Sequence, residues 1–255
     1  MKLLNLPLIT AVLASACSAP ALAASYTIDW LDMSATGLAA TVTSPSPTYY
    51  LPGYGHVLVT YDATPLNWTR NQGPLLQNGS FSAAGNNYAW TTRDSVDAVN
   101  FGVDGTSLDY TLTFTLLDGP IAAGLLVLGT AGLGHSSAAG FTTVTVLQNG
   151  TFLNDWDLGA NFGPTDFSGG VGNFTVKNSL SAPTPGFFNT DLGVTRIDDS
   201  VSSLTLRVHH IGQDGIGFNI GLISPVPEPA TTTCAAAGLL LLARRRRPVA
   251  AGTVA

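Results

Sequence analysis

The sequence predicts an all-β protein, and three features support that prediction. Charged residues make up only 10% of the 255 residues, and the good helix formers Glu and Lys occur once and twice. Gly (28) and Pro (15) punctuate the chain with turns. Between the turns, apolar and polar residues alternate with a period of two. We therefore expect one antiparallel two-sheet sandwich or jelly roll over residues 24–224, followed by a short C-terminal hydrophobic helix.

Residues 1–23 have the pattern of a secretory signal peptide. Lys2 gives the positive start, and an apolar run follows from Leu3 to Ala16. Ala21 and Ala23 form a small-x-small cleavage site before Ala24. The sequence therefore predicts an exported protein whose mature chain begins at Ala24.

The clearest strand runs from Leu108 to Leu116, where five apolar residues alternate with Asp109 and three threonines. The same alternation predicts that Leu204, Leu206 and Val208 point inward while Thr205, Arg207 and His209 point outward, and it recurs from Ile216 to Leu222. Weaker patterns predict further strands at residues 26–31, 38–43, 56–61, 123–128, 141–147, 151–155 and 174–177.

Turn chemistry predicts how these strands connect. Asn149-Gly150 lies between two strand patterns, 144–147 and 151–153, and is the strongest hairpin signal in the chain. The apolar segment from Ile121 to Leu133 contains three glycines and is expected to form a buried strand pair with a turn. The stretches 44–55 and 159–172 are rich in Gly, Pro and polar residues, so we expect long loops there.

Charge and cysteine content exclude several classes of function. When Lys2 and the four terminal arginines are set aside, five basic residues remain against 16 acidic ones. A body this acidic repels phosphate backbones, so no nucleic-acid partner is expected. Cys17 lies in the signal peptide and Cys234 in the C-terminal hydrophobic segment. The exported body therefore has no cysteine for a disulfide and depends on its core for stability.

Aspartates supply the candidate ligands. The segment Asp155-Trp156-Asp157 has two carboxylates at i, i+2 spacing, with an aromatic residue between them. On a strand, this spacing would put both carboxylates on one face. With Asp198 and Asp199 they are candidates for calcium or glycan binding, since calcium prefers oxygen ligands. The alternative is that these aspartates serve turns and solubility. No zinc site is expected, because the adjacent His209 and His210 point to opposite faces of a strand.

The same residues argue for a binding or structural protein rather than an enzyme. A glycosidase needs two carboxylates, and the only glutamate, Glu228, lies in the C-terminal motif. An Asp-based polysaccharide hydrolase or lyase remains the alternative, as does a calcium-stabilised structural module. Exposed aromatic rings can stack on sugars, and the candidates in or near expected loops are Tyr49, Tyr50, Tyr54, Trp68, Trp90 and Trp156.

The C-terminus has three parts in order: Pro227-Glu228-Pro229, an apolar stretch from Ala230 to Ala243, and the cluster Arg244, Arg245, Arg246 and Arg247. As a helix the apolar stretch would extend ~21 Å at 1.5 Å per residue, which is short of a bilayer core of about 30 Å. The arginines favour the cytoplasmic side, so the upstream chain would lie outside.

Residues 225–247 resemble the PEP-CTERM sorting signal, and residues 248–255 form a tail beyond it. The resemblance implies transient insertion in the inner membrane and cleavage near the motif by a membrane protease of the exosortase type. It also implies delivery to the surface or matrix of a bacterium that makes exopolysaccharide. A simple tail anchor with a Pro-rich stalk is the alternative. We expect an exported surface or extracellular-matrix protein with a structural, adhesive or polysaccharide-associated role.

Overall fold

The computed structural model describes residues 23–32, 48–62, 67–76, 78–91, 93–99, 107–133, 135–136, 140–159, 162–178, 189–211 and 215–227. These residues form strands and turns, with no helix among them, so the described part of the chain is all-β as predicted. The described strands all belong to one compact unit that ends at Pro225.

The strands are β1 (Ser25–Trp30), β2 (Thr48–Leu51), β3 (Gly55–Asp62), β4 (Asn67–Leu76), β5 (Gly79–Ala83), β6 (Asn86–Trp90), β7 (Arg93–Val99), β8 (Ser107–Leu116), β9 (Leu126–Ala131), β10 (His135–Ser136), β11 (Gly140–Phe141), β12 (Thr143–Val146), β13 (Gly150–Trp156), β14 (Phe162–Gly163), β15 (Thr165–Gly170), β16 (Asn173–Asn178), β17 (Asn189–Thr190), β18 (Leu192–Ile197), β19 (Ser203–Ile211) and β20 (Gly215–Pro225).

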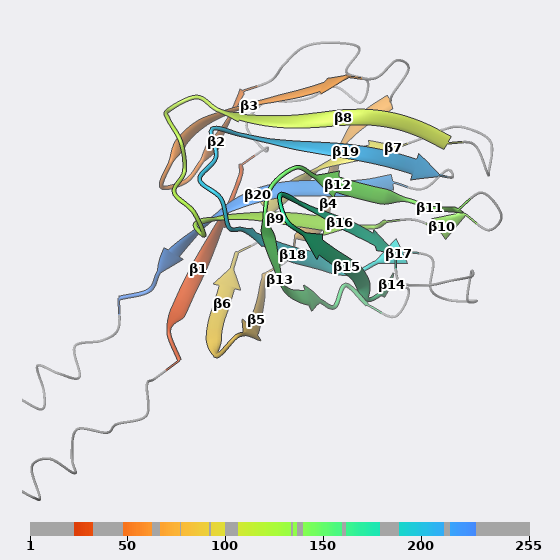
Figure 1. Cartoon of the computed structure of the whole chain (residues 1–255). Helices are drawn as coiled ribbons and strands as arrows, with labels where there is room; N and C mark the ends of the chain where they lie inside the picture. The colour runs from red at the N-terminus through yellow and green to blue at the C-terminus, as the bar shows by residue number, and fades with distance from the viewer. Residues whose placement is uncertain are drawn as a thin grey trace, which may run out of the picture. The chain divides into compact units, whose positions relative to one another are not determined.

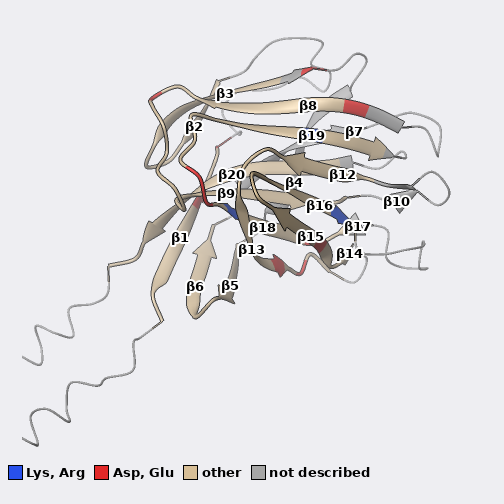
Figure 2. Cartoon of the chain, in the orientation of Figure 1, with Lys and Arg blue, Asp and Glu red and all other residues tan. Residues whose placement is uncertain are grey.

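Two large sheets contain most of these strands (Figure 1). The first has seven strands in the order β15-β16-β12-β19-β8-β3-β2. The second has nine, in the order β13-β18-β9-β20-β1-β6-β5, with β7 also paired to β20 and β4 paired to β7. The described pairings are antiparallel except β1 with β6 and β14 with β17. Charged residues are sparse over both sheets (Figure 2).

The main core lies between the two sheets and follows from the period-two alternation. On β8, Tyr110, Leu112, Phe114 and Leu116 point inward and are buried, while the threonines between them are partly exposed. Leu204, Leu206 and Val208 of β19 and Ile216, Phe218 and Ile220 of β20 join the same cluster. The three strongest strand patterns are therefore confirmed, including the direction of their side chains.

A second core fills the curled nine-stranded sheet, which is nearly barrel-shaped because its end strands β13 and β5 contact each other. Trp30 and Trp90 are buried inside it, with their rings edge to face at 6.2 Å. Gly221, the cross-strand neighbour of Trp30, leaves room for this packing: a Cβ atom there would lie 2.6 Å from Ile28 and 2.9 Å from the indole. A large ring over a glycine is a recurrent way to fill a sheet.

The predicted hairpin at Asn149-Gly150 is wrong. The strand before it, β12, already pairs with β16 on one side and β19 on the other, so it has no free edge for the strand that follows. Instead β13 pairs with β18 of the other sheet. The Asn-Gly pair therefore carries the chain from one sheet to the other.

Both predicted long loops contain strands in their described parts. Residues 48–51 form edge strand β2, and residues 162–170 contain β14 and β15. The apolar segment from Ile121 to Leu133 is not a strand pair: Ile121 makes an isolated bridge with Val201, and a turn then leads into the single buried strand β9. The patterns at 26–31, 56–61, 151–155 and 174–177 correspond to β1, β3, β13 and β16.

Several sequence predictions fall beyond the described ranges. These are the strand at 38–43, most of the signal peptide, and the hydrophobic helix with its arginine cluster. Within the described ranges, no helix has the length and apolar character needed to cross a bilayer.

Candidate functional site

An open groove of about 480 Å³ lies on the outer face of the seven-stranded sheet. It crosses β3, β8, β19 and β12, and the side chains that define its chemistry are charged or hydroxylic. They are Asp62, Asp109, Thr111, Thr143, Thr145, Arg207 and His209.

The strand register brings these residues together. Arg207 of β19 lies between Thr111 of β8 and Thr145 of β12, and Thr111 is in turn opposite Asp62 of β3. His209 lies opposite Asp109 in the neighbouring row. Because Tyr110 and Val208 point into the core, the residues on either side of them must point outward. The alternation that builds the core thus also builds the polar groove.

Two features organise the groove. His209 Nδ1 lies 2.6 Å from Asp109 Oδ1, an ion pair when the imidazole is protonated. Asp62 lies diagonally across from Asp109, a position that separates two residues on neighbouring strands by about 7–8 Å. Threonine hydroxyls also bond across the strands of this face: the groove residue Thr145 lies 3.2 Å from Thr175, and Thr113, which is not in the groove, lies 3.1 Å from Thr205.

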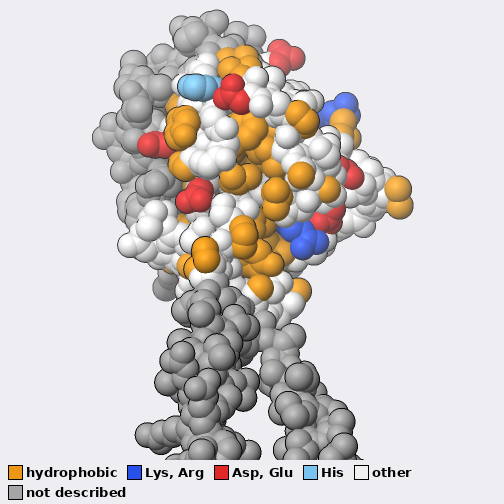
Figure 3. All heavy atoms as spheres, turned by 90° about the vertical axis from the view of Figure 1, so that its left-hand side faces the viewer, with side chains coloured by type: hydrophobic (Ala, Val, Ile, Leu, Met, Phe, Trp, Pro, Cys, Tyr) orange, Lys and Arg blue, Asp and Glu red, His pale blue; other side chains and the backbone are white. Residues whose placement is uncertain are grey.

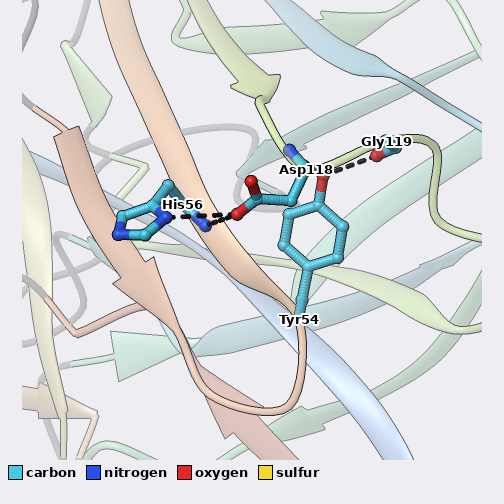
Figure 4. A network of polar contacts seen from close by, with 4 residues as sticks. All are labelled: Tyr54, His56, Asp118 and Gly119. Carbon is cyan, nitrogen blue, oxygen red and sulfur yellow. Dashed lines mark hydrogen bonds and ion pairs between the residues drawn. The ribbon is translucent and has the colours of Figure 1, made fainter.

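A second polar cluster lies at the other end of β3, where Tyr54, His56 and Asp118 meet (Figure 4). The His56 backbone N–H donates to Asp118 Oδ2 at 2.7 Å, and the imidazole Nδ1 lies 3.1 Å from the same oxygen. Tyr54 donates its hydroxyl hydrogen to the Gly119 carbonyl and accepts a bond from the Asp118 N–H. These bonds tie the turn between β2 and β3 to the turn after β8.

Hydrogen bonding sets the charge state in this cluster. The backbone N–H of His56, with a further contribution from its ring, lowers the pKa of Asp118. Partial burial raises the pKa of Tyr54, so its hydroxyl stays protonated and available as a donor. Asp118 is thus a fixed anion that orients His56.

Tyr50 lies beside this cluster and is the exposed aromatic side chain of β2. Its side chain is 53% exposed, and its ring contacts the His56 ring edge to face at 6.0 Å. Leu117, which is half exposed, follows β8 and donates its backbone N–H to the His56 carbonyl. On the side of the molecule drawn in Figure 3, hydrophobic side chains alternate with polar ones.

The predicted aspartate candidates divide between two places. β13 pairs with β18 from Gly150–Ile197 to Trp156–Leu192, so Asp155, opposite Gly193, and Asp198 lie near opposite ends of this ladder, ~17 Å apart at about 3.3 Å per residue. Asp198 accepts bonds from Thr151 Oγ1 and Arg196 Nε. Asp198 therefore links the end of β18 to the start of β13 through these two side chains.

Asp199 is fully engaged by the turn between β12 and β13. It accepts bonds from the backbone N–H and the side-chain amide of Asn149, at 2.6 to 3.1 Å. These bonds lower the pKa of Asp199. The Asn149-Gly150 segment is therefore fixed by the turn between β18 and β19.

Asp155 and Asp157 do not share one strand face, because β13 ends at Trp156. Asp155 Oδ2 accepts the Thr165 N–H at 3.1 Å, and Asp157 accepts the N–H of Gly159. Burial raises the pKa of Asp155. A third carboxylate, Asp191, lies near both and was missed, because only the β13–β18 pairing brings it there; its pKa is raised by burial and by the charges of Asp157 and Asp155.

No group of three metal-ligating side chains suited to an ion occurs within the described ranges. Trp156 packs against Trp90, with the two ring centroids 5.5 Å apart. Tyr49 and Trp90 are buried, and Tyr54 and Trp156 pack partly buried against the two cores, so four of the six aromatic candidates contribute to core packing. Trp68 lies on β4, but its side chain is outside the described set.

Of the expected processing sites, Ala23, Ala24 and Pro227 are described, whereas Ala21, Glu228, Pro229 and the arginines Arg244, Arg245, Arg246 and Arg247 are not. The Ala24 carbonyl accepts a bond from the Asn87 N–H, so the expected first residue of the mature chain is already attached to β6.

The sequence matches no protein-family model, and neither the curated proteins nor the solved structures include a significantly similar chain.

Proposed function

We propose that this chain is an exported, non-catalytic β-sandwich module that associates with polysaccharide at the cell surface or in the extracellular matrix. The observation that carries the polysaccharide assignment is the open groove lined by Asp62, Asp109, Arg207 and His209. Glycan hydroxyl groups both donate and accept hydrogen bonds, and this groove offers carboxylates, a guanidinium, an imidazole and hydroxyls within one surface.

The sorting part of the proposal rests on the C-terminal sequence. Residues 225–247, with the Pro227-Glu228-Pro229 motif, act as a PEP-CTERM-like signal. Its short hydrophobic helix inserts transiently in the inner membrane, and an exosortase-type protease cleaves the signal. The ends of the domain suit such processing, because β1 begins just after Ala24 and β20 ends at Pro225. Cuts before Ala24 and after Pro225 would leave the paired strands β1 and β20 intact.

The second candidate is an Asp-based polysaccharide hydrolase that uses Asp62 and Asp109. Their diagonal positions on neighbouring strands, about 7–8 Å apart, bring the two side chains to the same part of the groove, where a glycosidase would need two carboxyl groups about 5–10 Å apart. The groove argues for binding instead, because the Asp109 side chain is 80% exposed, whereas a glycosidase acid lies in an apolar environment that favours its protonated form.

The binding test uses affinity electrophoresis of the full chain in gels that contain soluble polysaccharide. Arg207→Ala should abolish the retardation, and Val171→Ala, in the fully exposed turn between β15 and β16, is the matched control. Equal retardation of both variants would refute the groove assignment. Release of reducing ends by the unmodified protein, lost in Asp62→Asn and Asp109→Asn, would instead establish the hydrolase.

The sorting test is the intact mass and location of the protein in its own host, with and without Pro227-Glu228-Pro229 changed to alanines. We expect a mature species that starts near Ala24, lacks the arginine cluster and lies outside the cell only when the motif is intact. A full-length chain held in the inner membrane in both cases would indicate the tail anchor.

Calcium stabilisation is tested by melting the protein with calcium and then with a chelator. A reversible rise in Tm would identify the calcium-stabilised module, because a ligand that binds only the folded state stabilises it.

A further inference from the structure

The groove is one end of a longer polar surface. On β3, the outward residues between Asp62 and His56 are Thr60 and Leu58, and on β8 Thr113 and Thr115 continue the same face. β3 is hydrogen-bonded to β8, and β8 to β19, so these rows form a continuous surface (Figure 1). Asp62 and His56 are six residues apart, which is ~20 Å along a strand.

The far end of this surface carries an exposed aromatic ring. Tyr50 is paired with His56 across β2 and β3, and its ring is more than half exposed. The imidazole beside it is held by Asp118, whose own position is fixed by Tyr54 and the turn after β8. An exposed aromatic ring next to a fixed polar group suits the apolar face and the hydroxyl rim of a sugar ring.

We propose that this face binds an extended neutral polysaccharide along β3 and β8, with the groove as one subsite and Tyr50 with His56 as a second. This inference rests on the proposed polysaccharide binding and adds its direction, its length dependence and the chemistry of the chain. The small side chains between the two subsites, chiefly Thr60, Thr113 and Thr115, let a linear chain lie flat and offer it hydroxyl groups.

The charges on the face determine the class of polysaccharide. Asp62, Asp109 and Asp118 contribute three carboxylates, against which Arg207 is the permanently charged base of the groove. A uronate chain laid along β3 would pass all three carboxylates and be repelled. A neutral hexose chain has no such cost and can use the carboxylates as acceptors.

The experiment measures the affinity of the full chain for cellobiose, cellotetraose and cellohexaose by calorimetry, with oligogalacturonate as the charged comparison. We expect affinity to rise with chain length as the second subsite is reached. Tyr50→Ala should weaken the affinity for cellohexaose by about tenfold, which corresponds to ~1.4 kcal/mol. The affinity for cellobiose should not change. Tyr50→Phe keeps the ring and should retain most of the affinity, and Val171→Ala is the surface control.

The outcomes separate the two proposals. Binding that is lost in Arg207→Ala but is independent of chain length and of Tyr50 would overturn the second subsite and leave the groove assignment standing. Tighter binding of oligogalacturonate than of cellohexaose would overturn the neutral class. Absence of binding to every oligosaccharide, with the Tm of each variant unchanged, would refute both the groove and its extension.

Discussion

Gly221→Ala is expected to destabilise the protein although it adds a single methyl group. Gly221 lies on β20 between β1 and β9, and a Cβ atom there would approach Ile28 Cγ2 at 2.6 Å, Trp30 Cε3 at 2.9 Å and Val127 Cγ2 at 3.1 Å. Carbon atoms prefer separations of about 3.5–4.0 Å. All three neighbours are buried, so none can move away into solvent.

The size of the effect follows from two opposing contributions. Overpacking of a core by one methyl group costs about 1–3 kcal/mol. Replacing glycine lowers the entropy of the unfolded chain, which stabilises the folded state by roughly 0.5–1 kcal/mol. The net destabilisation is about 1–2 kcal/mol, and Tm should fall by roughly 2–8 °C at about 2–4 °C per kcal/mol for a domain of this size.

The assay is urea and thermal unfolding of the purified chain, followed by circular dichroism. Gly170→Ala on edge strand β15 is the matched control, because its nearest contact would be an ordinary 3.4 Å. In an Ile28→Ala background, which removes the closest contact, Gly221→Ala should cost about 1 kcal/mol less, a coupling of the size that contacting residues show. If Gly221→Ala and Gly170→Ala have equal effects, the close packing of Trp30 on β20 is refuted.

Three further predictions concern the polar contacts. Tyr54→Phe removes a hydroxyl that makes two hydrogen bonds to the turn after β8 and should lower the free energy of unfolding in urea by about 1–2 kcal/mol; an unchanged midpoint would show that these bonds do not stabilise the two turns. Hydrogen bonds from Asn149 lower the pKa of Asp199, so the ionised carboxylate stabilises the folded state at neutral pH. This stabilisation is lost as pH falls through the lowered pKa. Asp199→Asn should therefore lower Tm at pH 7 and have little effect in strong acid. Asp191 should affect stability in the opposite direction, because its raised pKa means that the ionised carboxylate is disfavoured in the folded state. Asp191→Asn should therefore raise Tm at pH 7, and this gain in Tm should disappear as pH falls through the raised pKa of Asp191. Equal Tm profiles for these two Asn variants would contradict both assignments.

Strands with strict alternation were predictable, and strands without it were not. β8, β19 and β20 carry regular apolar positions that the core enforces. β5 and β6 (GSFSA and NNYAW) have few aliphatic residues and are held by aromatic packing of Phe81, Tyr88 and Trp90, a contact that no local pattern encodes. The Asn149-Gly150 signal was wrong because both edges of β12 are occupied, and edge occupancy depends on strands distant in the sequence.

The candidate site was predictable only in part. Alternation placed Arg207 and His209 outward, but it could not show that Asp62 and Asp109 lie in the same groove, because that depends on the order of four strands. Asp155 and Asp198 are separated for the same reason. Of the aromatic candidates with described side chains, burial takes Tyr49 and Trp90 into the core and leaves Tyr50 at the surface.

The pairing of β1 with β20 constrains the order in which the protein can fold. Tyr26 is the register partner of Pro225, so β1 cannot pair with its antiparallel neighbour β20 until nearly the whole chain has been made. β20 also pairs with β7 and β9, so these two strands cannot complete their pairing before β20 has been made either. Contacts between distant parts of a chain form slowly. A chain that emerges from its N-terminus therefore stays incompletely folded until its last strand is out, and its unpaired strand edges are exposed for the same interval.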